Sequence, residues 1–225
     1  FESGDYHLFL KHWVNFVASN GGFLALRHNF ANYTQPYLYL LVVGSWLLPF
    51  LPDVVVIKLI SIVFDLLCAV LIWRIVEMRR PQSLVAVLAF AAGWLSPTVV
   101  LNSAAWGQVD AMYTAFLLLA IYLLMKERPA LGIAVYGMAF AIKLQSIFLI
   151  PLVVVVVLRS RIRYLAWIVV VFIALMLPAI ALGKPVLDAL FTYGLQVGTV
   201  ERLTMGAPNW YQWLPPGDTP LAWWV

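Results

Sequence analysis

Long apolar runs alternate with short polar segments along most of the chain. A helix needs about 20 residues to cross the hydrocarbon core of a bilayer. Residues 54–76 are the clearest span, and the pattern continues with spans at 84–101, 111–125 and 164–182. Two shorter runs, 130–142 and 146–158, indicate tilted or broken helices that meet in the membrane. The pattern therefore predicts an all-α, polytopic transmembrane helix bundle.

Polar and aromatic residues dominate the first 36 positions. Their apolar positions predict amphipathic helices, broken at Gly21-Gly22, that lie on a membrane and do not cross it. Residues 37–52 are apolar but short, which favours a re-entrant or interfacial helix. We therefore divide the chain into an external loop with amphipathic helices (1–36), a transmembrane helix bundle (37–183), and an external loop with an interfacial segment (184–225).

Basic residues gather in three connections between the apolar runs, at 77–81, 126–129 and 159–163. Short loops rich in lysine and arginine face the cytoplasm. The predicted spans place all three connections on one side, so the orientation is self-consistent. The opposite, external side then holds Asp5, residues 102–110, Lys143 and residues 184–225.

Composition excludes a soluble globular domain, because 64% of the residues are hydrophobic, 11% are charged and the mean hydropathy is +0.94. The net charge of +4 belongs to the basic connections, and the chain carries no nucleic-acid-binding signature. The single cysteine, Cys68, rules out an intrachain disulfide and a cysteine metal site. The chain begins at Phe1 without a methionine and ends in Trp223-Trp224-Val225, so we expect an incomplete chain.

Asp5 is the leading candidate for a catalytic residue. It follows a glycine and is interleaved with aromatic residues at the expected membrane surface. A carboxylate in a partly dry cleft there can act as general base toward an acceptor hydroxyl. Aspartate is also a preferred N-cap residue, and Asp5 could cap a helix that begins at Tyr6. The two interpretations do not exclude each other.

The polar segment 102–110 joins two apolar runs on the external side. Gln108 and Asp110 can face the cleft, where they would position sugar hydroxyls or orient cationic neighbours. The alternative is a plain connection between helices, in which Asp110 caps a helix that starts at Ala111.

Lys143 and Gln145 interrupt an otherwise apolar stretch. A buried ammonium at membrane depth is costly unless it is paired or hydrated. Lys143 could bind a phosphate as a compact point charge. Alternatively, it reaches the interface or pairs with Asp65 or Asp110.

Arg202 is a second external cation that could bind phosphate, although a lone arginine in a loop is more often solvated. His7 and His12 are weak indications of a metal site, and we expect ordinary polar contacts for them. The chain contains no P-loop, dinucleotide fingerprint, zincin motif or nucleophile elbow.

Six segments in this order resemble the GT-C superfamily of glycosyltransferases that depend on polyprenyl-phosphate sugars. The chain is similar to bacterial membrane proteins related to GPI mannosyltransferases, and to the eukaryotic glucosyltransferases that extend lipid-linked oligosaccharides. The segments are Gly4-Asp5-Tyr6, Lys11-His12-Trp13, Asn32-Tyr33, Pro36-Tyr37-Leu38, Trp106-Gly107-Gln108-Val109-Asp110, and Lys143-Leu144-Gln145 before Pro151.

The resemblance implies a role for each matching position. Asp5 would be the catalytic base, and Lys143 and Gln145 would lie near the donor phosphate. The expected substrate-binding set is Gln108, Asp110, Lys143, Gln145, Arg202 and His12. Some relatives use two aspartates separated by one residue to bind metal, and this chain has no such pair. We therefore assign no metal ligand and leave a divalent cation open as a cofactor.

The implied function is inverting transfer of a hexose, mannose or glucose, from a polyprenyl-phosphate donor to a lipid-linked, glycan or protein acceptor. It would take place at the extracytoplasmic face of a bacterial plasma membrane. The competing class is a non-enzymatic membrane protein, either a lipid-linked-sugar transporter or a structural subunit of a larger membrane complex. A transporter would place its essential ionisable groups near the midplane, at Asp65 and Lys58.

Overall fold

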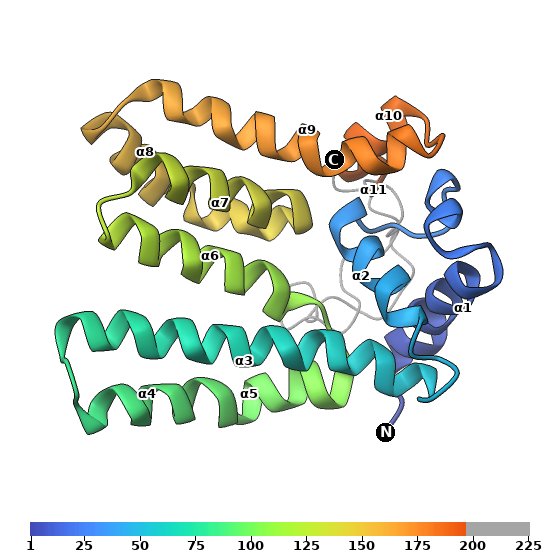
Figure 1. Ribbon diagram of the computed structural model, residues 1–225, viewed down its shortest axis with the longest axis horizontal. Coiled ribbons are helices and arrows are strands. Elements are labelled where there is room, and N and C mark those ends of the chain that lie inside the picture. The colour runs from blue at the N-terminus through green and yellow to red at the C-terminus, as the bar shows by residue number, and fades with distance from the viewer. Residues whose placement is uncertain (197–225) are drawn as a thin grey trace, which may run out of the picture.

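The computed structural model describes residues 1–196, which form helices joined by short connections and contain no strand (Figure 1). Three helical stretches in that part of the chain are long and apolar enough to cross a membrane. They are α3 (Asp53–Arg79), the stretch Leu84–Trp106, and the stretch Ile162–Ala181. The expected all-α membrane helix bundle is confirmed.

The stretch Leu84–Trp106 is broken into three pieces: α4 (Leu84–Leu95), α5 (Pro97–Val100) and the π-helix η3 (Leu101–Trp106). The break lies at Ser96, whose backbone is extended and whose side chain accepts a hydrogen bond from the amide of Val99. Proline disfavours helical backbone at the residue before it, so Pro97 explains the break. The polar segment 102–110 was expected to be the connection between two helices, but η3 continues the helical path to Trp106 and only residues 107–109 are irregular.

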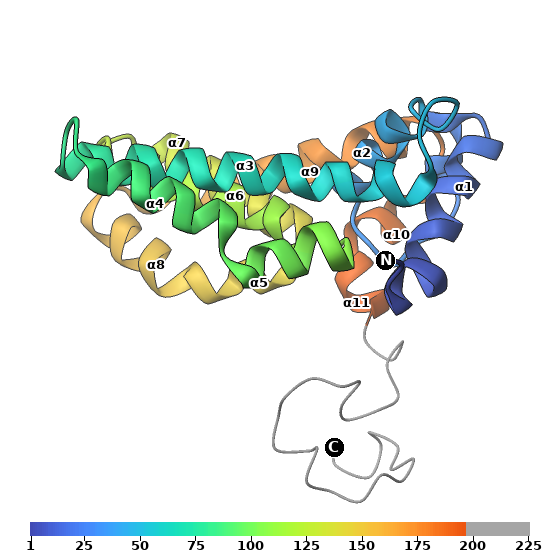
Figure 2. The ribbon, with the colours of Figure 1, turned by 90° about the horizontal axis from the view of Figure 1, so that it is seen from below.

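Shorter helices complete the bundle: α6 (Asp110–Met125), α7 (Pro129–Ile142), η4 (Leu144–Leu149), α8 (Ile150–Arg159), η5 (Ile162–Leu165) and α9 (Ala166–Ala181). Two glycines let α7 approach its neighbours closely. A Cβ added at Gly132 would lie 2.7 Å from a methyl carbon of Leu124, and one at Gly137 would lie 3.0 Å from the Cα of Ile168. Small residues permit this close packing of helices where lipid gives no hydrophobic drive. Figure 2 shows α4, α5 and α8 to one side of α3 and α9.

The remaining short helices gather at one end of the bundle (Figure 1). They are η1 (Tyr6–Leu10), α1 (Lys11–Ser19), η2 (Gly22–Arg27), α2 (Gln35–Ser45), α10 (Val186–Leu190) and α11 (Thr192–Gln196). Helix α1 buries Trp13, Val14 and Val17 and exposes the opposite face, as expected for an amphipathic helix. The expected break falls at Gly21, whose φ of 78° lies in the left-handed region that favours glycine. Helix α2 has 11 residues, fewer than a span needs.

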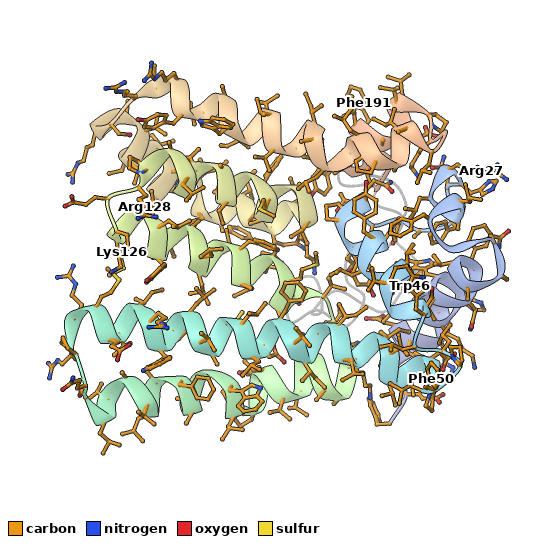
Figure 3. The ribbon with its side chains drawn as sticks, viewed as in Figure 1. Arg27, Trp46, Phe50, Lys126, Arg128 and Phe191 are labelled. Atoms are coloured by element: carbon orange, nitrogen blue, oxygen red, sulfur yellow. The ribbon has the colours of Figure 1, made fainter. Side chains whose placement is uncertain are left out.

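The connections rich in basic residues lie at one end of the bundle. Lys126 and Arg128 lie at one end, whereas Arg27, Trp46 and Phe50 lie at the other (Figure 3). The connections after α3 and α8 reverse the chain at the same end as Lys126 (Figure 1). The three basic connections therefore share one end, which we call the basic end. Residues 107–109, the start of η1, which follows Asp5, and the C-terminal end of α7, which Lys143 follows, lie at the opposite end, which we call the site end (Figure 1). The division of the chain at residues 36 and 183 stays a prediction.

We expect the basic end to face the cytoplasm, because short basic loops are retained on that side. In a background with Cys68→Ala, Arg161→Cys should react with a membrane-impermeant maleimide only after the cells are permeabilised. Asn20→Cys, exposed at the site end, is the matched control and should react in intact cells. Labelling of position 161 from outside intact cells would reverse the orientation.

Candidate active site

Asp5 does not cap a helix. Its backbone is helical, with φ −64° and ψ −32°, and its side chain makes no capping hydrogen bond. Ser3 takes that role, since its hydroxyl oxygen accepts a hydrogen bond of 3.2 Å from the amide of Tyr6. The capping interpretation of Asp5 was wrong because the helical turn begins before it. Its carboxylate is therefore available for other contacts.

Two side chains hold the Asp5 carboxylate by one oxygen. The indole Nε1 of Trp106 donates to Oδ2 over 2.9 Å, and the amide Nε2 of Gln108 donates to the same atom. Within residues 1–196 no hydrogen bond reaches Oδ1. Asp5 is partly exposed. The carboxylate is thus fixed in orientation, and its second oxygen has no hydrogen-bond partner in the described part of the chain.

Gly107 brings the two donors to the same carboxylate. Its φ of 81° is left-handed, and it ends η3, so that residues on either side of it, Trp106 and Gln108, can both reach Asp5. Helix α3 fixes this turn, because the hydroxyl of Ser61 donates to the carbonyl oxygen of Gln108 over 2.7 Å. Ser3 donates to the carbonyl oxygen of Trp106 over 2.8 Å, which ties the Asp5 segment to the same turn.

Lys143 and Asp110 form an ion pair, in which Nζ donates to Oδ1. Asp110 is the first residue of α6 and makes no capping bond there, so its capping interpretation was wrong. Lys143 has extended backbone between α7 and η4. Of the two partners considered for Lys143, the structure shows Asp110. Asp65 instead accepts a hydrogen bond of 3.0 Å from the hydroxyl of Ser103.

The charge of Lys143 is maintained by its surroundings. Burial lowers the pKa of its ammonium, but the nearby Tyr33 hydroxyl and the Asp110 carboxylate raise it, and the net shift is upward. The ammonium is mostly enclosed, with 19% of the side chain exposed, against 37% for Asp110. A cation therefore persists at the site end at any physiological pH.

Tyr33 lies close to all three charged groups. Its pKa is raised chiefly by burial, with Lys143 lowering it and Asp110 and Asp5 raising it further, so it interacts electrostatically with each of them. The ring packs against Trp13, with 5.4 Å between ring centroids. Thr34 places this segment beside the end of α7, because its hydroxyl donates to the carbonyl oxygen of Ile142 over 3.0 Å.

Four of the seven expected site residues thus share one region: Asp5, Gln108, Asp110 and Lys143. Tyr33 and Trp106 were given no role from the sequence. Both stood inside segments that carried the family resemblance, and this was the only signal that could have selected them.

The other expected residues lie apart from this group. His12 and Gln145 are exposed on α1 and η4, and in the described part of the chain no hydrogen bond or ion pair joins either of them to Asp5 or Lys143. His7 pairs with Glu2 at 3.0 Å. Arg202 lies outside the described residues. Residues 1–196 contain no group of three His, Cys, Asp or Glu side chains that could hold a metal ion.

A cavity of about 450 Å³ runs from Asp110 toward the membrane-spanning helices. It lies between α3, the α5–η3 stretch and α6, and apolar side chains such as Ile72, Val99 and Leu118 share its walls with Asp65. Lys58 makes a different contact, at the site end, where Nζ donates to the carbonyl oxygen of Phe1 over 2.7 Å. The site end therefore combines a held carboxylate, an ion pair and an adjoining, largely apolar cavity.

A model of one protein family matches residues 33–213, and that family is described as glycosyltransferase family 87, which is of the GT-C type. No curated protein and no solved structure is significantly similar to the chain. The matched range includes Gln108, Asp110 and Lys143, and it begins after Asp5. It covers most of the chain, which therefore belongs to glycosyltransferase family 87.

Proposed function

We propose that the protein is an inverting hexosyltransferase that takes its sugar from a polyprenyl phosphate and works at the extracytoplasmic face of the membrane. Membership of glycosyltransferase family 87 supports sugar transfer. One observation supports the assignment of the base: the Asp5 carboxylate, held at Oδ2 by Trp106 and Gln108, leaves Oδ1 for an acceptor hydroxyl.

The reaction needs a base, because a sugar hydroxyl is a weak nucleophile. Asp5 Oδ1 takes the proton from the acceptor hydroxyl as the hydroxyl oxygen forms its bond to the anomeric carbon. The bond between that carbon and the phosphate oxygen breaks, and the phosphate keeps the electron pair. A single displacement of this kind inverts the anomeric centre and forms no glycosyl-enzyme, unlike the two-carboxylate retaining scheme of hydrolases.

Lys143 is suited to the departing phosphate. Its ammonium is charged and mostly enclosed, and an oriented cation stabilises negative charge better in a dry site than in water. The phosphate would compete with Asp110 for this ammonium. The cavity that begins at Asp110 and continues among α3 and α6 supports a place for the first isoprene units of the donor, since its walls there are largely apolar.

Transfer with purified protein tests the proposed reaction. We expect label to move from polyprenyl-phosphate mannose or polyprenyl-phosphate glucose to an octyl hexoside acceptor, and the product should have the anomeric configuration opposite to that of the donor. Nucleotide-activated mannose and glucose serve as control donors and should give no product. Transfer from a nucleotide sugar, or retention of configuration with the lipid donor, would contradict the proposal.

A further inference from the structure

A second cavity, of about 440 Å³, opens at the site end between η1 and α1, the segment 29–35, and the α10–α11 region. This volume is typical of small-molecule sites, which span about 300–1,000 Å³. Aromatic rings form part of its wall, among them Trp13, Phe30 and Tyr33. Among the described residues, none that was expected from the sequence to bind substrate lines it. We call it the aromatic cavity.

Gln35 lines the aromatic cavity and has an unsatisfied polar atom. The residue is 1% exposed, and its Oε1 has no hydrogen-bond partner among residues 1–196. Buried polar atoms are normally hydrogen-bonded, because leaving one unpaired is costly. A ligand hydroxyl that donates to this oxygen would satisfy it.

A network of polar side chains forms another part of the wall. The ammonium of Lys184 donates to the carbonyl oxygen of His28 over 3.1 Å and to Oδ1 of Asn29 over 2.8 Å. Asn29 in turn donates to Oδ2 of Asp188 over 2.6 Å. Burial lowers the pKa of Lys184, and Asp188 opposes that shift. Donors and acceptors are therefore held in fixed positions along the cavity.

Aromatic faces together with fixed donors and acceptors suit a ligand that has apolar C–H faces and many hydroxyls. A hexopyranose has both. We propose that the aromatic cavity binds a hexopyranose unit of the acceptor, and this assignment to the acceptor rests on the proposed function. Tyr33 lines the cavity and also interacts electrostatically with Asp5 and Lys143, so the aromatic cavity and the candidate active site share this residue.

Gln35→Leu tests the cavity directly, because it removes the unpaired oxygen at similar size. The affinity of the full-length protein for methyl α-D-mannopyranoside and methyl α-D-glucopyranoside is measured by saturation-transfer NMR in a detergent that carries no sugar. The better-bound hexoside should lose affinity about 10–100-fold, as expected when a buried hydrogen bond is lost. The Michaelis constant for the octyl hexoside acceptor should rise by a similar factor, and that for the lipid donor should not change.

Tyr37→Phe is the matched control. Tyr37 lies on the same helix, is 1% exposed and also has an unpartnered oxygen within the described part of the chain, but it does not line the aromatic cavity. Its removal should leave hexoside affinity and both Michaelis constants unchanged. If Gln35→Leu does not fold, Asp188→Ala at the half-buried wall provides the same test and should weaken hexoside binding.

The results of these experiments distinguish an error in the proposed binding site from an error in the proposed function. If Gln35→Leu and Asp188→Ala both bind hexosides as well as the wild type does, the inference is overturned. It is also overturned if Gln35→Leu raises the Michaelis constant for the lipid donor and leaves that for the acceptor unchanged. Gln35-dependent hexoside binding by a wild-type protein that transfers no sugar would support a saccharide site but contradict the proposed function. If the wild-type protein transfers sugar but Gln35→Leu does not weaken hexoside binding, the aromatic cavity is not the hexopyranose site, and the proposed function still stands.

Discussion

Asp5→Asn should slow sugar transfer by roughly 10²–10⁴-fold, the usual contribution of a positioned general base. Asparagine keeps the size of the side chain, and its amide oxygen can still accept the hydrogen bonds from Trp106 and Gln108. The substitution removes the negative charge and the ability to take a proton. Initial rates at saturating donor and acceptor, measured on purified protein, give the loss of turnover.

Two controls separate chemistry from structure in this experiment. Glu2→Gln changes a neighbouring, exposed carboxylate that pairs with His7, and it should leave turnover unchanged. The melting temperature and donor Michaelis constant of Asp5→Asn should stay near those of the wild type. Wild-type turnover in Asp5→Asn would show that Asp5 is not the base, and Asp110 would then be the next carboxylate to test.

The bundle could be predicted from the sequence because each membrane span is marked by its own run of apolar residues. An uninterrupted apolar run such as 54–76 has one stable form in a bilayer, since a helix satisfies every backbone group internally. The break before Pro97 is likewise a local property of the chain. The helical form of residues 102–106 was missed, because the polar and small residues there gave no helical pattern. Contacts with Ser3 and α3 hold this part of the π-helix.

The candidate site depends on contacts between residues that are far apart in the sequence, and local sequence patterns do not predict such contacts. Asp5 and Gln108 are 103 positions apart, and Lys143 and Asp110 are 33 apart. Aspartate before a helix suggests a cap at either position, but Trp106 and Gln108 hold the Asp5 carboxylate and Lys143 pairs with Asp110. The shared end of the bundle could be predicted from the basic connections, whereas the pairing of particular side chains could not.

Gln35 illustrates the same limit for the aromatic cavity. In the sequence it is one polar residue before a proline, in a segment that reads as a turn. Its significance comes from its burial in the folded chain, which leaves Oε1 without a partner in the described part of the chain, and from its place in the wall of the aromatic cavity. Gln35 is therefore a candidate ligand contact because of its tertiary packing, which the sequence does not reveal.

Lys143→Gln should raise the Michaelis constant for the polyprenyl-phosphate donor by roughly 10–100-fold. This is the range expected when a hydrogen bond to a charged group is lost. Turnover at saturating donor should fall much less, because the donor phosphate is already negatively charged before transfer and most of its attraction to Lys143 is therefore present in the bound donor. Donor titrations on purified protein separate these two quantities.

The ion pair with Asp110 offers a different explanation for any defect in Lys143→Gln, since removing one partner of an enclosed pair leaves the other unpaired. Asp110→Asn and the double variant decide between the two. If the ammonium binds the donor phosphate, Asp110→Asn keeps donor affinity near the wild type or improves it, and the double variant remains as defective as Lys143→Gln. If Lys143 only neutralises Asp110, both single variants lose melting temperature and donor affinity together, and the double variant recovers them. Recovery in the double variant would remove Lys143 from the phosphate site, because a residue that contacts the donor cannot be compensated by loss of its own partner.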